Sequence, residues 1–469
     1  MKNINLLYLQ IVISLTCPFF SDKATSQVIS AGWNHSLFIC GNDNNAPWCW
    51  GIGQNGQLGN GALTSRHLPY QTSSVSNIIA ICGRYNHSIA LSGDSTVWAW
   101  GDNTFSQIGD ATSTQRNSPV HVKGLGGVGI LSGIIGISGG DYHSLAVKAD
   151  GTVWAWGRNG GQLGDNTTIN RSTPILVPGL FGITAVSGGG EFSIALSKTG
   201  NVYTSGIGGS GQLGNGSTAN VHSFVQINLS GIIAIAAGNI HSLVLKNDST
   251  VWAFGSNGFG QLGDGTTNDS DTAIRVSNLT GIIAIAASGY HSMALKSDGT
   301  VWSWGDNLNG DLGDGTNIQR NYPIKLDSLS GIIEITCGTS HGLALKNDSY
   351  VWAWGNNQYG QLGDNTQTER DYPVQVKYLC SFLSVAEETI DQKITIAPNP
   401  FNTSFNITFN EEQKNTSIKL IDLLGQEVRT YKLTGRQILI EKDKLIDGIY
   451  FLQIEDSNKN ILSKKIIVQ

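Results

Sequence analysis

Short apolar runs recur along most of the chain, and each run ends at glycine or at a polar turn. Residues 232–236 and 242–245, for example, are four or five residues long and mostly aliphatic or β-branched. Such runs predict short buried strands rather than helices. Trp302 and Trp304 are two residues apart, so both rings are expected on the same face of one strand.

The same order of runs occurs seven times, at intervals of about 50 residues. The units share the pattern Ile-Ile-x-Ile, a small-residue turn, His-Ser, an apolar pair, a polar turn, Val-Trp-x-Trp-Gly and a Gly-Gln-Leu-Gly-Asp turn. The tryptophan pair is replaced by Tyr203 and Ser205 in unit four and by Trp252 and Phe254 in unit five. Successive units are marked by His35, His87, His143, Phe192, His241, His291 and His341. One small sheet cannot bury both of its faces, whereas a closed ring of sheets can. The sequence therefore predicts an all-β fold, with a seven-bladed β-propeller over residues 27–380 and the tryptophan pairs between its blades.

One stretch carries a family resemblance. Residues 291–307, His-Ser-Met-Ala-Leu-Lys-Ser-Asp-Gly-Thr-Val-Trp-Ser-Trp-Gly-Asp-Asn, are followed by Gly-Asp-Leu-Gly at 310–313. This string resembles the regulator of chromosome condensation repeat, and the resemblance covers about residues 28–380. It implies a fold more than an activity. The family includes a nuclear guanine-nucleotide exchange factor, a plant UV-B photoreceptor and a secreted bacterial β-lactamase inhibitor, which all act through protein–protein contact on a propeller face.

The composition changes near residue 390, and residues 393–469 are expected to form a separate module. Beyond residue 392 there is no tryptophan and glycine falls to three residues. Phe405, Ile407 and Phe409 alternate with polar residues, and about seven short strands are expected. This pattern predicts a small C-terminal β-sandwich after a linker at 381–392.

This module resembles the type IX secretion sorting domain of Bacteroidetes. The resemblance rests on the runs at 398–400, 425–428, 447–451 and 464–468. It implies handling by the type IX secretion machinery, passage through the outer membrane and removal of the module, with release or anchoring of the rest. The sorting signal would then include Pro398, Asn399, Pro400, Gly425, Gly448, Tyr450, Lys464 and Lys465. A carbohydrate-binding or adhesive sandwich is the alternative.

The N-terminus has the pattern of a secretory signal over residues 1–26. Lys2 is followed by a mostly apolar stretch from 6 to 20 and by the small residues 24–26. A lipoprotein site at Cys17 and a buried N-terminal segment are the alternatives. No later stretch approaches the 18 apolar residues of a spanning helix, so the mature chain is expected to lack a membrane span and to be secreted or displayed at the cell surface.

Charge and cysteine content limit the functions further. Lys+Arg total 29 and Asp+Glu total 35, for a net charge of −6, which disfavours binding to nucleic acid or anionic membranes. No C-x-x-C motif is present, so zinc and thioredoxin-type sites are not expected. Cys40 and Cys49 flank an expected hairpin and form a candidate disulfide, with two buried thiols as the alternative.

Several motifs imitate catalytic or cofactor sites. Adjacent His and Ser on a strand point to opposite faces and recur in nearly every unit, so a structural role is expected. Two G-x-G-x-x-G matches, at 209–214 and 258–263, are blade turns that open no helix. The Gly-Asp-Gly-Thr turns at 263–266 and 313–316 are poor in calcium ligands and are expected to be solvated. We therefore expect no catalytic residue, cofactor or metal.

The most informative variation lies in the two positions before each histidine. These positions are expected in the loop between the innermost strand and the next one, at the rim of the central channel. Trp33 is the one tryptophan outside the repeated cassettes, and it falls in this set. The rim hypothesis assigns binding to Trp33, Tyr85, Asp141, Tyr142, Glu191, Asn239 and Tyr290. Tryptophan and tyrosine are favoured binding anchors, although such aromatics can also simply cover the channel mouth.

These features together predict an exported binding or scaffold protein. Its partner would be an extracellular protein or a glycan. A secreted enzyme acting on polysaccharide is one alternative, with Asp141 and Glu191 as the only carboxylate pair to test. A propeller that inhibits a secreted enzyme is the other. Among the photoreceptor relatives the rim carries clustered tryptophans, and only Trp33 matches here, which argues against a similar light sensor.

Overall fold

The computed structural model describes residues 28–40, 44–72, 74–379, 394–397, 403–421, 427–443, 445, 448–455 and 461–468. The chain divides into two compact units, residues 1–380 and 381–469. The expected signal segment 1–26, the expected linker 381–392 and four sorting residues lie outside the described residues: Pro398, Asn399, Pro400 and Gly425. Within the described residues, no helix is long and apolar enough to cross a membrane.

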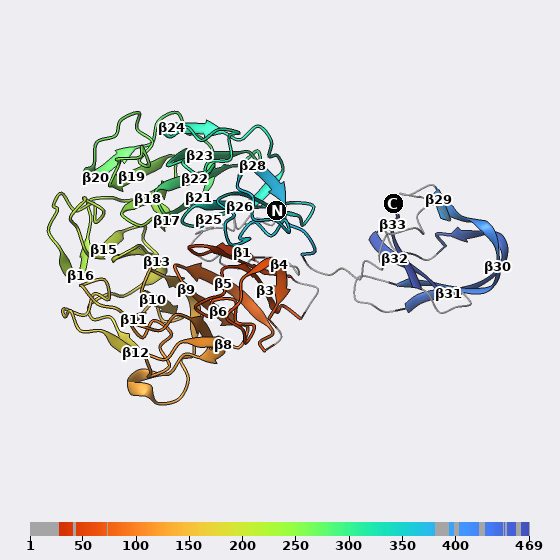
Figure 1. The fold of residues 1–469 in the computed structure, drawn as a ribbon, viewed down its shortest axis with the longest axis horizontal. Helices are drawn as coiled ribbons and strands as arrows, with labels where there is room; N and C mark the ends of the chain where they lie inside the picture. Colours follow the sequence, from red (N-terminus) through yellow and green to blue (C-terminus); the bar gives the residue numbers. More distant parts are fainter. Residues whose placement is uncertain are drawn as a thin grey trace, which may run out of the picture. The chain divides into compact units, whose positions relative to one another are not determined.

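Seven four-stranded antiparallel sheets form the first unit, arranged as blades around a central axis (Figure 1). The innermost strands are β1 (Val28–Ala31), β5 (Ile78–Arg84), β9 (Ile134–Gly139), β13 (Ile183–Gly188), β17 (Ile232–Ala237), β21 (Ile282–Ser288) and β25 (Ile332–Cys337). The second strands are β2 (His35–Ile39), β6 (His87–Ser92), β10 (His143–Lys148), β14 (Phe192–Ser197), β18 (His241–Lys246), β22 (His291–Lys296) and β26 (His341–Lys346).

The third and outermost strands complete each blade. The third strands are β3 (Pro47–Gly51), β7 (Val97–Gly101), β11 (Val153–Gly157), β15 (Val202–Gly206), β19 (Val251–Gly255), β23 (Val301–Gly305) and β27 (Val351–Gly355). The outermost are β4 (Arg66–Gln71), β8 (Arg116–His121), β12 (Arg171–Leu176), β16 (Val221–Gln226), β20 (Ser270–Arg275), β24 (Arg320–Lys325) and β28 (Arg370–Gln375). A short 3-10 turn, η1 (Leu125–Gly127), interrupts the connection from β8 to β9. The four strands of each blade are consecutive in sequence, so blade 1 is β1–β4 and blade 7 is β25–β28.

The glycine that ends each third strand is required by its backbone. Gly101 has a φ of +107°, a conformation that side chains rarely adopt, and a Cβ there would lie 2.5 Å from the carbonyl oxygen of Asn86. The close approach lets the start of β6 lie directly against the end of β7. This contact explains why each Val-Trp-x-Trp cassette is followed by glycine.

Neighbouring blades are joined by a repeated set of hydrogen bonds. Trp100 is fully buried, and its Nε1 donates to the carbonyl oxygen of Gln57 in the preceding blade at 2.8 Å. Ser88 Oγ donates to the same carbonyl at 2.9 Å, and it therefore accepts from His35 Nε2, 3.0 Å away. The same His–Ser contact across blades occurs at His87–Ser144, His143–Ser193, His241–Ser292 and His341–Ser36. These five histidines thus contact a serine of the next blade and not their own sequence neighbour, whereas His291 has no such contact because Gly342 replaces the serine in blade 7.

The ring closes by side-chain contacts between blades 7 and 1. Ser36 Oγ and Trp50 Nε1 both donate to the carbonyl oxygen of Gln361 at 2.8 Å. Ile29 N donates to Glu334 Oε1 at 3.3 Å, which ties β1 to β25. The first and last blades therefore meet through the same kind of seam as the other blades.

The C-terminal unit is a five-stranded sheet folded around one core. Its strands are β29 (Ile394–Ala397), β30 (Ser404–Ile421), β31 (Glu427–Glu441), β32 (Gly448–Glu455) and β33 (Ile461–Val468). The first half of β30 pairs with β29, its second half pairs with β32, and β31 pairs with both halves. Phe405 and Ile407 from the first half share a buried cluster with Ile418 and Leu420 from the second. The small C-terminal all-β module is confirmed, but long continuous strands replace the seven short ones expected.

The sorting residues within the described part lie in the last two strands. Gly448 begins β32 and pairs with Val468, and Tyr450 is buried in the core. Lys464 and Lys465 are in β33, paired with Leu452 and Phe451.

The candidate Cys40–Cys49 disulfide is wrong. Cys49 is a buried free thiol that accepts a hydrogen bond from Thr72 Oγ1 at 3.6 Å, whereas Cys40 is disulfide-bonded. The register of the hairpin explains the error, because Cys49 lies opposite Leu37 on β2 and not opposite Cys40.

Candidate recognition face

Two sets of loops lie at the same end of the blades. The rim loops join each innermost strand to the second strand, and the exit loops follow each third strand. The first residue of an exit loop bonds to the rim loop of its blade: Arg158 N donates to Tyr142 O at 2.9 Å, and Asp306 N donates to Tyr290 O at 3.0 Å. We call the surface formed by both sets of loops the rim face.

Backbone hydrogen bonds connect the rim loops of neighbouring blades. Trp33 N donates to Tyr85 O at 3.0 Å, and Asp141 N donates to Gly189 O at 3.1 Å. Further bonds of 3.0–3.2 Å join Gly190 to Asn239, Asn239 to Gly289 and Thr339 to Gly32. These bonds run from blade to blade around the channel. The main chains of these rim loops are therefore held to one another.

Four aromatic side chains form a continuous row of ring contacts across blades 1 to 3. The rings of Trp33 and Tyr85 are 4.6 Å apart and nearly parallel, and those of Tyr85 and Tyr142 are 4.9 Å apart. Phe105 meets Tyr142 edge-on at 5.1 Å. Burial, followed by its hydrogen bond with Tyr85, raises the pKa of Tyr142. We call Trp33, Tyr85, Phe105 and Tyr142 the aromatic sector, and Trp33, 36% exposed, is its most accessible member.

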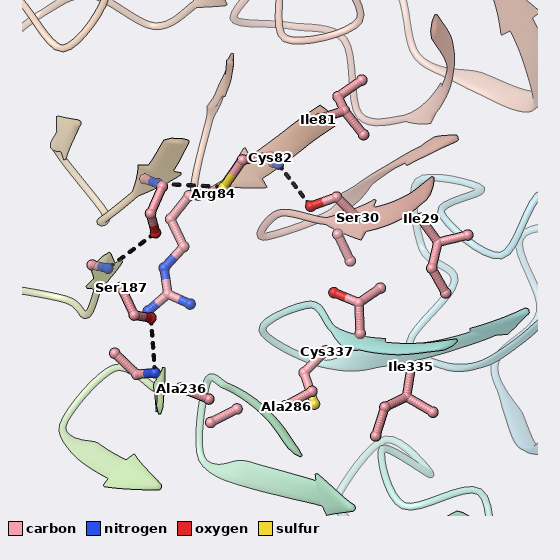
Figure 2. Close-up of a pocket in the computed structure, with 18 of the residues that line it drawn as sticks. Ile29, Ser30, Ile81, Cys82, Arg84, Ser187, Ala236, Ala286, Ile335 and Cys337 are labelled. Carbon is pink, nitrogen blue, oxygen red and sulfur yellow. Dashed lines mark hydrogen bonds between the residues drawn. The ribbon is translucent and has the colours of Figure 1, made fainter. Parts of the chain in front are cut away.

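An arginine of blade 2 reaches across the central channel. Figure 2 shows Arg84 extending between the innermost strands, among small side chains such as Ser187 and Ala236. Its Nη1 donates to Ser288 Oγ at 3.1 Å and its Nη2 to the carbonyl oxygen of Gly238 at 3.0 Å. Its Nε lies 3.5 Å from Asp141 Oδ1. Burial raises the pKa of Asp141, although the positive charge of Arg84 opposes the rise.

The two carboxylates of the enzyme hypothesis are each engaged by a different arginine. Asp141 pairs with Arg84, and Glu191 pairs with Arg158, whose guanidinium also lies 5.4 Å from the Phe105 ring and 5.6 Å from the Tyr142 ring. Among the described residues, no group of three or more His, Cys, Asp or Glu could hold a metal ion. The rim as found is a packed surface in which these charges are internally paired.

The other rim residues lie on later blades. Asn239 Oδ1 is buried and has no hydrogen-bond partner among the residues described. Tyr290 packs against Phe259 at 5.0 Å. Of the seven residues in the rim hypothesis, the structure thus places Trp33, Tyr85 and Tyr142 in one stack. Asp141 and Glu191 border that stack through their arginines.

Sequence reasoning missed Phe105, Arg158 and Arg84. The first two lie in exit loops, which were treated only as turns. The sequence did distinguish Arg84 from its counterparts. The residue three positions before the histidine or phenylalanine that marks each unit is glycine in five units and Ser288 in a sixth. Arg84 is the only charged residue at this position.

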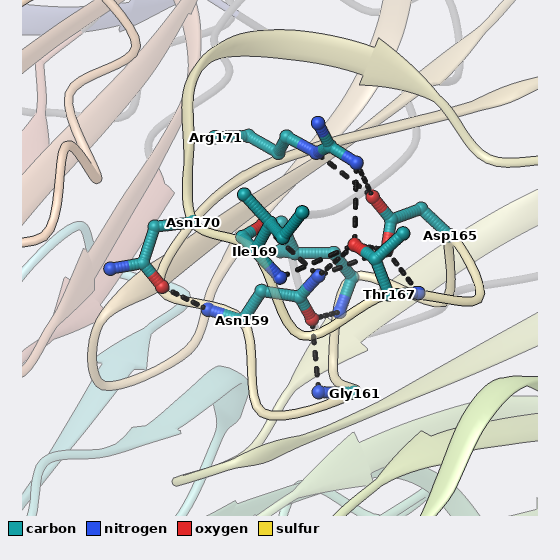
Figure 3. Close-up of polar contacts among 8 residues, drawn as sticks. Asn159, Gly161, Asp165, Thr167, Ile169, Asn170 and Arg171 are labelled. Carbon is teal, nitrogen blue, oxygen red and sulfur yellow. Dashed lines mark hydrogen bonds and ion pairs between the residues drawn. The ribbon is translucent and has the colours of Figure 1, made fainter.

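The Gly-Asp turns use their carboxylates internally. Figure 3 shows Asp165 surrounded by Asn159, Thr167 and Arg171. Arg171 Nε donates to Asp165 Oδ2 at 2.9 Å, and Thr167 Oγ1 donates to Oδ1 at 2.7 Å. The same arrangement occurs at Asp314, within the turn 313–316, with Thr316 and Arg320. These bonds fix the long exit loops against the outermost strands.

Family comparisons agree with this architecture. The model described as "Regulator of chromosome condensation (RCC1) repeat" matches residues 47–91, 94–147, 150–196, 199–245, 248–295, 298–345 and 348–386. The chain belongs to this family. The first match runs from the third strand of one blade to the second strand of the next, so a repeat spans a seam between blades. The model "Secretion system C-terminal sorting domain" matches residues 395–469 and indicates export through the type IX system to the cell surface or outside.

Individual relatives match only part of the chain. The ultraviolet-B receptor UVR8 of Arabidopsis thaliana is 31% identical over 156 residues, which are 33% of this chain and 34% of the receptor. The human E3 ubiquitin-protein ligase HERC2 is 28% identical over 156 residues, 32% of this chain but 3% of the ligase. The chain thus spans about a third of the receptor and a small part of the ligase.

Solved structures share the fold. Human WBSCR16 superposes with a TM-score of 0.62 at 23% identity, covering 70% of this chain and 93% of that one. Yeast RCC1 (Prp20), in its complex with Kap60, gives 0.65 at 19% identity, covering 84% and 92%. At these identities the similarity establishes the propeller fold alone.

Proposed function

We propose that this protein is an exported recognition module whose rim face binds an extracellular protein or glycan. In this proposal the signal 1–26 is removed on export and the module 393–469 is removed after the outer membrane is crossed. The propeller, residues 27–380, then acts outside the cell or on its surface. The observation that carries the proposal is the rigid aromatic sector with Trp33 36% exposed.

An exposed, rigid aromatic stack is suited to binding. Large rings bury much apolar area on contact and lose little conformational entropy, so Trp and Tyr dominate binding hot spots. The ring contacts and the backbone bonds between rim loops hold these side chains before a partner arrives, which lowers the ordering cost of association. The adjacent charges are already paired, so contact with the aromatic sector leaves no new unpaired charge.

The enzyme alternative lacks such support. Glycoside hydrolysis needs one carboxyl group as acid and another as base or nucleophile beside the substrate. Asp141 and Glu191 instead face Arg84 and Arg158. Inhibition of a secreted enzyme would also be protein binding. That alternative differs from the proposal only in that the bound partner is an enzyme whose activity is blocked.

The test is affinity capture with the full exported chain as bait, from the outer surface and medium of the producing bacterium. The bait is compared with a triple variant, Trp33→Ala, Tyr85→Ala and Tyr142→Ala. The control is Tyr350→Ala, because Tyr350 is 53% exposed in the turn between β26 and β27, at the opposite end of the blades. Thermal unfolding of each bait verifies its folding.

We expect one partner to be held by the native chain and the Tyr350 control and lost by the triple variant. Equal capture by all three baits would reject the aromatic sector as the site. Mass spectrometry of the partner, with and without glycosidase treatment, distinguishes protein from glycan.

A further inference from the structure

The central channel contains a small cavity between the innermost strands. Its volume is about 70 Å³, several times what one water molecule requires. Small side chains such as Ala236, Ala286 and Cys337 line it, together with Arg84, which is only 7% exposed (Figure 2). The cavity therefore has room for a small ion beside a buried positive charge.

Each innermost strand has no further strand on its channel side, so alternate backbone N–H groups point toward the channel. In blades 2 to 5 one such N–H donates to a side chain of the preceding blade. Gly83 N donates to Ser30 Oγ at 2.9 Å, Gly139 N to Cys82 Sγ at 3.3 Å, Gly188 N to Ser138 Oγ at 3.2 Å and Ala237 N to Ser187 Oγ at 3.1 Å. These bonds satisfy the edge of each strand across the seam between blades.

The acceptor is missing ahead of blades 6 and 7. Its position is occupied by Ala236 in blade 5 and by Ala286 in blade 6, and a methyl group accepts no hydrogen bond. Ala287 and Cys337 pair with their second strands in the same register as Gly83 does in blade 2. Their N–H groups therefore point toward the channel in the same way, but the preceding blade offers them no side-chain acceptor.

Arg84 brings its charge to the same side of the channel. Its Nη1 donates to Ser288 Oγ at 3.1 Å, and Ser288 directly follows Ala287 in the chain. Its Nη2 donates to the carbonyl oxygen of Gly238 at 3.0 Å. Each Nη of an arginine carries two hydrogens, so a second hydrogen on each is left for another acceptor.

The other ionisable groups near the cavity offset this charge only in part. Asp141 faces Arg84 from the Nε side at 3.5 Å, and burial raises the pKa of Asp141. Glu334 lines the cavity, but burial raises its pKa to about 8, so its carboxyl group is uncharged at pH 6. Burial also raises the pKa of the Cys337 thiol, which keeps its proton. Hydrogen-bond donors and one guanidinium thus dominate this side of the cavity.

This set of donors favours an anion. Backbone N–H groups that face one concavity bind anions, and a guanidinium adds charge-assisted hydrogen bonds. A metal cation needs acceptor ligands, which N–H groups and a guanidinium cannot supply. Water could accept from the same N–H groups but would not balance the charge of Arg84.

We propose that the channel cavity binds a small monovalent anion such as chloride, held by the Arg84 guanidinium and the backbone N–H groups of Ala287 and Cys337. The inference goes beyond the proposed function, because this site lies among the innermost strands and needs no partner at the rim face. The bound anion would join blade 2 to blades 6 and 7.

The test follows thermal unfolding of the full chain at pH 6 while chloride replaces gluconate at constant ionic strength. Gluconate is too large for a cavity of about 70 Å³. One variant combines Ala236→Ser with Ala286→Ser, which gives both N–H groups the acceptor found in other blades and fills part of the cavity. Ser138→Ala is the matched control, because it changes the equivalent position in blade 3 and leaves blades 5 to 7 as they are.

We expect the unfolding midpoints of the native chain and the Ser138→Ala control to rise by about 2–4 °C between zero and about 200 mM chloride. The double variant should show no rise. A constant midpoint in the native chain overturns the proposal and leaves water as the occupant. An equal rise in the double variant, or loss of the rise in the control, also overturns it, because the anion would then bind elsewhere.

Crystals of the native chain grown in sodium bromide locate the anion independently of any variant. Anomalous scattering at the bromine absorption edge should show bromide in contact with Arg84 and with the N–H groups of Ala287 and Cys337. A channel without an anomalous peak overturns the proposal. Either result leaves the capture experiment on the aromatic sector unaffected, so the proposed function is tested separately.

Discussion

The ring of Trp33 stacks on that of Tyr85 at 4.6 Å, with 9° between their planes, although 52 residues separate them in sequence. The contact joins the rim loops of blades 1 and 2, and a backbone bond between the same two residues accompanies it. The pair therefore helps to join two blades and also contributes the exposed ring of Trp33 to the rim face.

The effects of Trp33→Ala on stability and on binding should differ. Trp33 remains 36% exposed, so its removal should lower the free energy of unfolding by only about 1 kcal/mol. Binding of the captured partner should fall by about tenfold or more. Urea unfolding and titration calorimetry measure the two quantities. If the variant bound the partner as tightly as the native chain does, the role of Trp33 as an anchor would be contradicted.

Trp304→Ala should be strongly destabilising. Its ring is fully buried between blades 5 and 6, and its Nε1 donates to Gln261 O at 2.9 Å. Loss of the ring leaves a cavity, and we expect a destabilisation of about 3–5 kcal/mol in urea unfolding. Trp302→Ala is the control. Trp302 lies on the same strand but is partly exposed, so its removal should lower the free energy of unfolding by less. A loss below about 1 kcal/mol for Trp304 would mean that the ring is not buried.

The seam histidines should make the propeller acid-sensitive. Burial lowers the pKa of His143 to about 3, whereas an unfolded histidine has a pKa near 6.5. The unfolded state therefore binds more protons below pH 6.5, and stability falls as the pH falls from 6.5 towards 3. His143→Phe should therefore reduce, by roughly 3 kcal/mol, the amount by which the free energy of unfolding falls between pH 7 and pH 4.

Phe192 provides the precedent for that substitution. It occupies the histidine position in blade 4, and Ser242 of the next blade still donates to Gln212 O at 3.0 Å. Urea unfolding at several pH values measures the effect. His222→Phe, at an exposed position on β16, should leave the pH dependence as in the native chain. An unchanged acid slope in His143→Phe would show that this histidine protonates in the folded state.

Glu334 should have the opposite pH dependence. Burial raises the pKa of Glu334 to about 8, so stability is highest below the unfolded pKa near 4.5 and falls as the pH rises towards 8. Glu334→Gln keeps an oxygen for Ile29 N and removes the charge, so it should stabilise the ring by about 4 kcal/mol at pH 8 and little at pH 4.5. Asp327→Asn, at an exposed position, is the control. Equal effects of Glu334→Gln at both pH values would reject the titration.

Deletion of residues 393–469 should block export without unfolding the propeller. The two units are separately compact, and the sorting domain matches residues 395–469. The truncated chain should accumulate in the periplasm with the circular dichroism and thermal transition of the native propeller. Its appearance in the medium would contradict the sorting role.

The repeat itself was predictable because its determinants are local. The Val-Trp-x-Trp-Gly cassette specifies a strand, a buried ring and a glycine turn within five residues, and seven repeats of this unit, two of them without the tryptophan pair, leave one plausible architecture. The second tryptophan of the cassette is indeed fully buried, as at Trp100 and Trp354. The trio Trp33, Tyr85 and Tyr142 was also accessible to sequence reasoning, because all three fall in the two positions before the histidine and the corresponding loops of successive blades are neighbours.

Features that depend on register or on the far side of the ring were not predictable. The candidate Cys40–Cys49 bridge failed because the hairpin register places Cys49 opposite Leu37, three residues from Cys40. The edge-on contact of Phe105 with Tyr142 joins an exit loop of one blade to a rim loop of the next. The partner of Arg84, Ser288, is 204 residues away and becomes a neighbour only when the ring closes.

Arg84 also changes how the ring responds to local damage. In most repeat proteins each unit contacts only its neighbours, so stability is approximately a sum of units and interfaces. Arg84 belongs to blade 2 but binds Asp141 in blade 3, Gly238 in blade 5 and Ser288 in blade 6. A disturbance in one blade is thereby transmitted directly across the diameter. The propeller should unfold as one cooperative body, and an event at the rim near Asp141 has a physical route to the opposite blades.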